Sequence, residues 1–66
     1  MMKKTLYIGL DKKGKVVNTS PARDLLFGDD IVDVVTMSND KDMFAVMEAR
    51  FGRPSLEEFK TRLDKL

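Results

Sequence analysis

The 66-residue sequence contains no cysteine and no histidine. Disulfide bonds are therefore excluded, and so are zinc sites built from thiolate or imidazole ligands. A chain of this length buries only about 60% of its unfolded surface on folding, and small domains usually compensate with disulfides, a metal or self-association. A well-packed core or self-association remains as the source of stability. The lack of cysteine also fits a reducing compartment, and we expect a cytoplasmic protein.

Long apolar runs are lacking as well. The apolar stretch near the start of the chain extends only from Leu6 to Leu10 before charged residues follow at 11–13. That is too short for the apolar region of a secretory signal and far too short for a membrane span. We therefore expect no leader, no membrane contact, and a single small domain over residues 1–66.

The composition is 42% hydrophobic and 35% charged, which is typical of a globular protein. The net charge of +1 hides a segregation along the chain. Residues 1–20 carry five lysines against one aspartate, whereas residues 21–48 carry seven acidic residues against Arg23 and Lys41. This segregation either steers a partner or is neutralised within the fold.

The first half of the chain predicts a β-hairpin. Apolar and other residues alternate over 5–10, and a returning strand is expected over 15–18. Between them, Asp11 and Gly14 have the types that a type I turn with a bulge requires. Gly9, inside the first strand, indicates a bulge or the close approach of another backbone.

A short helix and a third strand are expected next. Ser20 is a suitable N-cap, Pro21 suits the first helical position, and a helix through Phe27 would end at Gly28. Residues 31–37 are rich in β-branched side chains and apolar on both faces, which predicts a central, well-covered strand. Its aspartate, Asp33, either faces solvent or meets a lysine or arginine.

The second half of the chain predicts two helices. Ser38, Asn39 or Asp40 would cap the first, which runs to about Phe51 and ends at Gly52. Its apolar residues lie within an arc of about 160° that is expected to face the core; they are Met43, Phe44, Val46, Met47 and Phe51. The two methionines are expected in the core, with an adaptable binding surface as the alternative.

The last helix begins at a capping box formed by Ser55 and Glu58, and Glu58 is placed to pair with Arg62. It carries a narrow apolar seam of about 80°; the seam consists of Leu56, Phe59, Leu63 and Leu66. The predicted order is β-β-α-β-α-α: a small α+β domain with a three-stranded sheet, the hairpin plus a third strand, and helices packed on it.

Catalytic chemistry has little support. Nucleophilic catalysis needs an activating base, and the serines at 20, 38 and 55 stand where helix caps are expected. Asp29 and Asp30 resemble a metal-binding turn only weakly. The group Asn39, Asp40 and Asp42 lacks the spacing of a calcium loop. The glycines are too far apart for a phosphate loop. We expect neither an enzyme nor a cofactor nor a metal.

A nucleic-acid-binding regulator is the alternative function. Lys12, Lys13 and Lys15 form a basic hairpin that would contact phosphates, and the two C-terminal helices resemble a helix-turn-helix in outline. Glu57 and Glu58, however, stand at the start of the second helix, where they would repel phosphates.

The function we expect is protein–protein contact. A small regulatory or inhibitory accessory protein, of the kind that viruses of bacteria direct against a larger host protein, has this size and this lack of chemistry. The expected contact residues are Arg50, Arg53, Phe59 and Leu63, with the hairpin lysines second. A homodimer is a further expectation, because the seam of the last helix suits docking either on its own domain or on a second copy. Arg50 either anchors a partner or extends along its own helix end.

Overall fold

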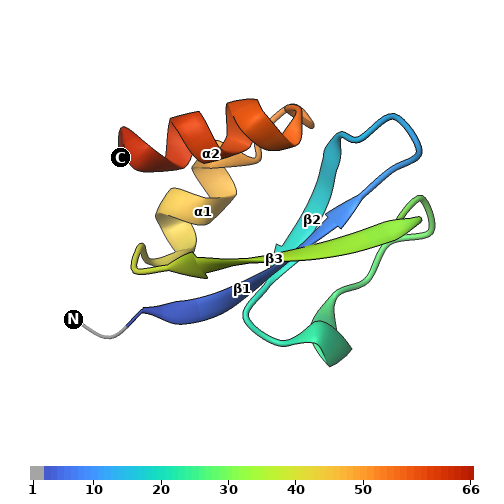
Figure 1. Cartoon of the computed structure of the whole chain (residues 1–66), viewed down its shortest axis with the longest axis horizontal. Helices are drawn as coiled ribbons and strands as arrows, with labels where there is room; N and C mark the ends of the chain where they lie inside the picture. Colours follow the sequence, from blue (N-terminus) through green and yellow to red (C-terminus); the bar gives the residue numbers. More distant parts are fainter. Residues whose placement is uncertain (1–2) are drawn as a thin grey trace.

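Residues 3–66 are described by the computed structural model, in which a three-stranded antiparallel sheet carries two helices on one face (Figure 1). The predicted α+β class and the sheet are confirmed. The elements, in chain order, are β1 (Lys4–Leu10), β2 (Val16–Ser20), a single 3₁₀ turn η1 (Arg23–Leu25), β3 (Asp33–Asn39), α1 (Met43–Ala49) and α2 (Leu56–Asp64). None of the helices in this range is both long and apolar enough to cross a membrane.

The hairpin between β1 and β2 forms as predicted, and its turn is held by one side chain. Asp11 Oδ1 accepts hydrogen bonds from the main-chain N–H groups of Lys13 and Lys15, both at 2.9 Å. Gly14 has φ +78°, a conformation that side chains disfavour. The turn therefore depends on residue types within five positions of one another.

Gly9 has two roles in the sheet. The pairing of β1 with β2 shifts register between Gly9 and Leu10, which is a bulge. On the sheet face opposite the helices, a Cβ at Gly9 would collide with the side chain of Ile31. The close approach that the sequence indicated thus comes from a side chain, and it holds the segment between β2 and β3 against this second face.

That segment crosses the second face without forming the helix predicted from Pro21 to Phe27 (Figure 1). Ser20 Oγ does accept a bond from the N–H of Ala22 at 3.1 Å, but only the 3₁₀ turn follows. A short helix is marginal unless it buries an apolar face. Here Leu25 and Phe27 are exposed, so no packing stabilises a longer helix.

The third strand lies at an edge of the sheet, not in its centre. The strand order is β2-β1-β3, and β3 pairs with β1 alone over seven residue pairs. Asp33 is exposed, and its Oδ1 accepts from the N–H of Val34 at 2.9 Å. The β-branched residues predicted the strand correctly. The β-branched residues did not predict the position of β3 in the sheet, because that position depends on the path of the segment between β2 and β3.

The core lies between the sheet and the two helices, and α2 contributes its largest side chain, the fully buried Phe59. Ser55 caps α2 by accepting from the N–H of Glu58 at 3.2 Å, as predicted. The eight buried apolar residues are Leu6, Ile8, Leu10, Val16, Val46, Ala49, Phe59 and Leu63.

The first helix begins later than expected. Its N-cap is Asp42, which accepts from the N–H of Ala45 at 2.9 Å, and none of residues 38–40 serves as the cap. The reason is that β3 continues to Asn39, whose side chain bonds both the N–H and the C=O of Lys41. Only two residues thus separate the strand from the helix cap, and this short link restricts how α1 can turn.

Candidate protein-interaction surface

Helix α1 turns most of its apolar residues toward solvent. Only Val46 of the predicted core-facing arc is buried, together with Ala49. The other four large apolar side chains form what we call the α1 stripe; their exposed fractions are 41% for Met43, 83% for Phe44, 52% for Met47 and 81% for Phe51. The expectation that this arc faces the core is therefore wrong for four of its five members.

The geometry of the helix explains the outward stripe. At 100° per residue, the three stripe residues within the helix, Met43, Phe44 and Met47, fall within an arc of about 100°, and Val46 and Ala49 lie on the adjoining side. One side of a helix can contact the sheet, and here the two smaller residues take that position. A valine and an alanine let α1 approach closely, and the larger side chains are left outside.

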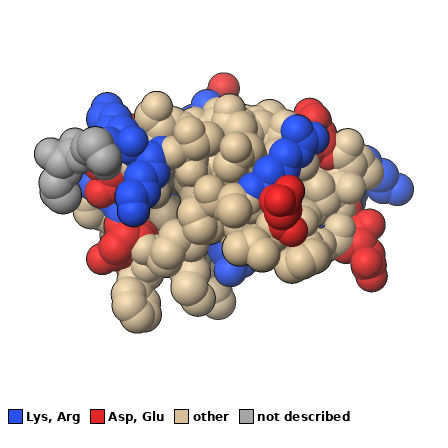
Figure 2. All heavy atoms as spheres, turned by 90° about the horizontal axis from the view of Figure 1, so that it is seen from below, with Lys and Arg blue, Asp and Glu red and all other residues tan. Residues whose placement is uncertain are grey.

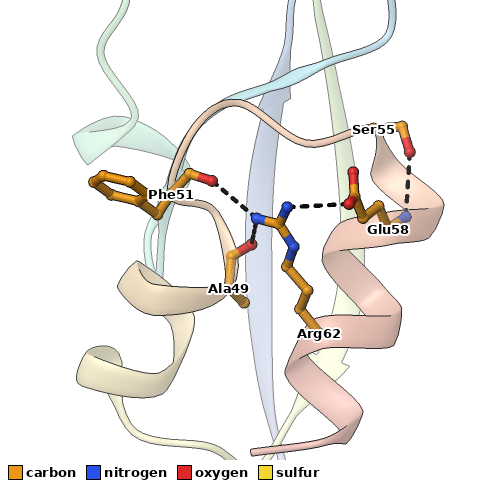
Figure 3. A network of polar contacts seen from close by, with 5 residues as sticks. All are labelled: Ala49, Phe51, Ser55, Glu58 and Arg62. Carbon is orange, nitrogen blue, oxygen red and sulfur yellow. Dashed lines mark hydrogen bonds and ion pairs between the residues drawn. The ribbon is translucent and has the colours of Figure 1, made fainter.

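Arg62 of α2 holds α1 in this orientation. Its Nη1 donates to the carbonyl of Phe51 at 2.9 Å and to that of Ala49 at 3.4 Å, while its Nη2 meets Glu58 Oε1 at 3.0 Å (Figure 3). The predicted pair between Glu58 and Arg62 is thus present. In Figure 3 the ring of Phe51 points away from the guanidinium and from α2. A cation at the end of a helix satisfies its free carbonyls.

A second apolar surface lies on the opposite side of the sheet. Leu25, Phe27 and Val32 of the crossing segment are all more than half exposed, and we call them the crossover surface. Asn18 Nδ2 fixes this segment by donating to the carbonyl of Phe27 at 2.8 Å. From this side, Figure 2 shows mostly uncharged residues over the middle of the molecule, with many of the charged groups toward its ends.

The four predicted contact residues have different positions. Phe59 and Leu63 are buried and pack in the chain's own core, so they do not form an accessible surface. Arg50 is half-buried at the C-cap of α1, and its Nε is enclosed without a hydrogen-bond partner among the described residues. Arg53 is exposed and pairs with Asp30 at 3.0 Å. The structure does not bring the four together into one patch.

The hairpin lysines are exposed, but acidic residues surround them. Lys12 and Lys13 line a shallow hollow together with Asp11 and the two aspartates at 29–30. Lys15 is exposed as well, and its main-chain N–H is the main cause that lowers the pKa of Asp11. The Asp11 carboxylate lies within the basic turn, and its negative charge weakens the attraction of these lysines for phosphate.

Residues suited to metal binding are scattered. Among residues 3–66 no three carboxylates gather closely enough to hold a metal ion, and the sequence has no histidine or cysteine. Ser55 caps α2 as expected, whereas Ser20 ends β2 and accepts from the N–H of Ala22 without capping a helix. Ser38 lies exposed in β3 instead of capping a helix.

Sequence reasoning missed the outward direction of the α1 stripe and the exposure of the crossover surface. The sequence pattern predicted a longer helix, to about Phe51, and the shorter observed helix of seven residues has less surface to turn toward the sheet. No family model, curated protein or solved structure matches the chain. The functional argument therefore depends on the geometry of the surface.

Proposed function

We propose that this protein is a non-catalytic binding module that regulates or inhibits a larger protein by attaching to it through the α1 stripe. The observation that carries the proposal is the exposure of two phenylalanines and two methionines. Met43, Phe44 and Met47 lie on one side of α1, and Phe51 follows just after the end of this helix. Single exposed apolar residues are common on protein surfaces. A contiguous group of large ones marks an interaction site far more often.

The energy available from the stripe is large for so small a protein. Burying one large apolar side chain contributes about 1.5–3 kcal/mol, and four such residues stand together here. Phenylalanine and methionine are enriched at interfaces, and methionine adapts its shape to an irregular partner. A partner groove that covered the stripe would therefore gain several kilocalories per mole before the costs of association.

The charges beside the stripe are of both signs. Asp42 and Glu48 are exposed next to it, while Lys41 lines a hollow with Met43, and Lys65 lines one with Phe51. Electrostatic complementarity therefore favours an apolar groove whose rim also carries both signs.

Partner capture with matched variants tests the proposal. Phe44→Glu places a charge in the centre of the stripe, while Thr61→Glu adds the same charge on the exposed side of α2. Each tagged protein is incubated with nuclease-treated lysate of its source or host, and retained proteins are identified by mass spectrometry. A stoichiometric partner that Thr61→Glu retains and Phe44→Glu loses supports the stripe.

Two results would contradict the proposal. If both variants retain the same partners as the unmodified protein, the stripe is not the contact. If retention disappears on nuclease treatment and returns with added duplex DNA, the hairpin lysines and nucleic acid take its place. Circular dichroism of each variant shows beforehand that the fold is intact.

A further inference from the structure

The sheet has one covered edge and one open edge. Along β2, Pro54 accepts a hydrogen bond from Val16 N at 2.8 Å, and Ser55 forms an isolated bridge with Lys15. Among residues 3–66 no strand pairs with the outer side of β3. Natural proteins often protect such an edge with a bulge, a lysine or a proline. Strand β3 pairs with β1 in unbroken register and contains no lysine and no proline, so its outer side is suited to pairing.

The outward main-chain groups of β3 are arranged symmetrically. The side chain of Asp33 accepts a hydrogen bond from the N–H of Val34, so this N–H points away from β1. In an antiparallel strand the direction alternates from residue to residue, so the groups of Thr36 and Ser38 point outward as well. Thr36 is the middle residue of the strand, and it therefore lies at the centre of the outward row.

Neither layer of the fold covers this edge. Val35 and Met37 pack against the core on the helix side but are only half-buried, so the helices leave part of β3 uncovered. On the other face Thr36 and Ser38 are exposed, because the crossing segment packs over β1, where Ile31 lies. A strand added at β3 would extend the sheet without displacing a helix or the crossing segment.

A second copy of β3 is complementary to this edge. About a two-fold axis through Thr36, this residue meets its own copy, and threonine pairs stabilise antiparallel strands. Val35 then stands opposite Met37 of the other copy, and both gain apolar cover. Asp33 stands opposite the uncharged Asn39, so no like charges face each other within the strand.

The same register satisfies the outward main-chain groups. Val34 pairs with Ser38 of the other copy at two symmetric places, and Thr36 pairs with its own copy between them. Each such pair exchanges two N–H···O bonds, so the edge gains about six in all. The N–H of Val34 then bonds the other copy in place of the Asp33 side chain, whose carboxylate is released.

Each released carboxylate gains a cation from the other copy. Lys4 pairs with Asn39 across β1 and β3, so Lys4, Asn39 and the other copy's Asp33 form one row across the joined sheet. Two strand spacings place the Cα atoms of Lys4 and Asp33 about 10 Å apart, which the two side chains can bridge. Both residues are exposed, and no ion pair within residues 3–66 includes either of them.

These two residues cannot pair within one chain. Asp33 is opposite Leu10 and Lys4 is opposite Asn39, at the two ends of the ladder between β1 and β3. The ladder is seven residue pairs long, which separates Asp33 from Lys4 by about 20 Å. The charge complementarity is therefore a property of the two-fold pair, and a second copy supplies it by symmetry alone.

The remaining charges near the ends of β3 are of both signs. Asp40 and Lys41 follow the strand, while near its start the hairpin lysines share a hollow with Asp29 and Asp30. Antiparallel pairing brings these two ends together, and their opposite signs largely offset each other. They therefore neither drive nor prevent the pairing.

We propose that two copies of this chain pair through their open β3 edges, antiparallel about a two-fold axis at Thr36, so that their sheets become continuous. Lys4 of each copy pairs with Asp33 of the other. Phe59 and Leu63 of the seam expected to meet a second copy are buried in the chain's own core, so β3 takes over that contact. This inference does not rest on the proposed function, because it uses a surface separate from the α1 stripe.

Sedimentation equilibrium of the whole chain tests the proposal. Pairing through one edge strand is small beside standard interfaces, so we expect a monomer–dimer equilibrium with a dissociation constant on the order of 10–100 μM. Amide exchange followed by NMR locates the contact. Exchange at Thr36 and Ser38 should slow by about threefold or more between about 50 μM and 1 mM protein, while exchange at Met47 stays unchanged.

Charge reversal tests the ion pair between the copies. Asp33→Lys and Lys4→Glu should each weaken dimerisation by about threefold to tenfold, because each change affects two symmetric contacts. The chain that carries both changes should regain most of the affinity. Since the two residues lie about 20 Å apart in one chain, such a rescue requires a contact between copies.

A proline variant removes the centre of the contact. Thr36→Pro deletes an outward N–H that does not bond β1, and proline is tolerated at a sheet edge. Dimerisation should weaken by about tenfold or more, whereas Thr36→Val keeps the N–H and should dimerise as before. Phe44→Glu in the α1 stripe should leave dimerisation unchanged. If Thr36→Pro does not fold, the charge-reversal variants decide the question.

Three outcomes would overturn the inference. The first is a monomer mass that stays constant up to about 1 mM. The second is dimerisation that folded Thr36→Pro leaves intact, or that Phe44→Glu abolishes, since the contact would then lie elsewhere. The third is a double charge reversal no better than the single ones. Partner capture lost in Phe44→Glu would still support the proposed function in each case, so the two proposals fail separately.

Discussion

The two helices of this protein begin alike and differ in what they bury. Each has a side-chain N-cap, Asp42 in α1 and Ser55 in α2. Helix α2 places the fully buried Phe59 in the core, whereas α1 contributes only Val46 and Ala49 and leaves Phe44 more than four-fifths exposed. Apolar content alone therefore does not decide which helix stabilises the fold.

The difference reflects how little of the sheet α1 covers. A sheet of three strands offers limited area, and α2 occupies much of it with one phenylalanine and one leucine. The large residues of α1 find no further room there and remain outside. An apolar face that folding does not use is available for binding, and this is why we assign the α1 stripe to a partner.

The largest expected effect separates the two helices directly. Phe59→Ala removes the largest buried side chain and should lower the free energy of unfolding by about 3–5 kcal/mol, which approaches the whole stability of a small domain. Phe44→Ala, on the exposed stripe, should change it by less than about 0.5 kcal/mol. Urea denaturation followed by circular dichroism measures both. Similar losses from the two variants would refute the division between the helices.

The second-largest effect on stability is expected from the contact between the two helices. Arg62→Met should lower the free energy of unfolding by about 1–2 kcal/mol, because two carbonyls at the end of α1 lose their donor. Glu58→Gln is the matched control, since it removes only an exposed ion pair with an expected cost of about 0.3–0.5 kcal/mol. Faster amide exchange in α1 than in α2 should accompany the Arg62 change. An equal cost from both variants would mean that Arg62 does not fix α1.

The N-caps of the two helices should contribute about equally to stability. Asp42→Ala and Ser55→Ala each remove a side-chain acceptor from a helix start, and each should cost about 1 kcal/mol. Thermal unfolding of the two variants gives the comparison, with Asp42→Asn and Ser55→Thr as controls that keep an acceptor. If only Ser55→Ala lowered the thermal stability, α1 would not be stably folded in the absence of a partner.

The smallest effect lies outside both helices, in the hairpin. The main-chain N–H of Lys15 is the largest cause that lowers the pKa of Asp11 below its ordinary 3.8, followed among the lowering causes by the N–H of Lys13 and the charge of Arg53, and partly opposed by desolvation. A lowered folded-state pKa stabilises above the unfolded value, and this contribution is lost as the pH falls through the folded pKa. Asp11→Asn keeps the acceptor and should remove this part of the acid sensitivity. An identical acid unfolding curve would exclude Asp11 as a contributor.

Much of the fold was predictable wherever the cause is local. The hairpin turn follows from Asp11 and Gly14, and the start of α2 follows from Ser55 and its bond to Glu58. The pair of Glu58 with Arg62 needs only one helical turn. Each of these features joins residues no more than five positions apart, so residue type and spacing are enough to determine it.

The sequence by itself thus determined the α+β class, the hairpin and the Ser55 cap of α2. Only the tertiary structure decided that β3 stands at an edge, that the segment after β2 forms one turn in place of a helix, and that the α1 stripe faces outward. These outcomes depend on which apolar side chains occupy the limited area of the sheet; the side chain of Ile31, for example, covers Gly9. Such packing involves residues far apart in the chain, so no local sequence pattern predicts it.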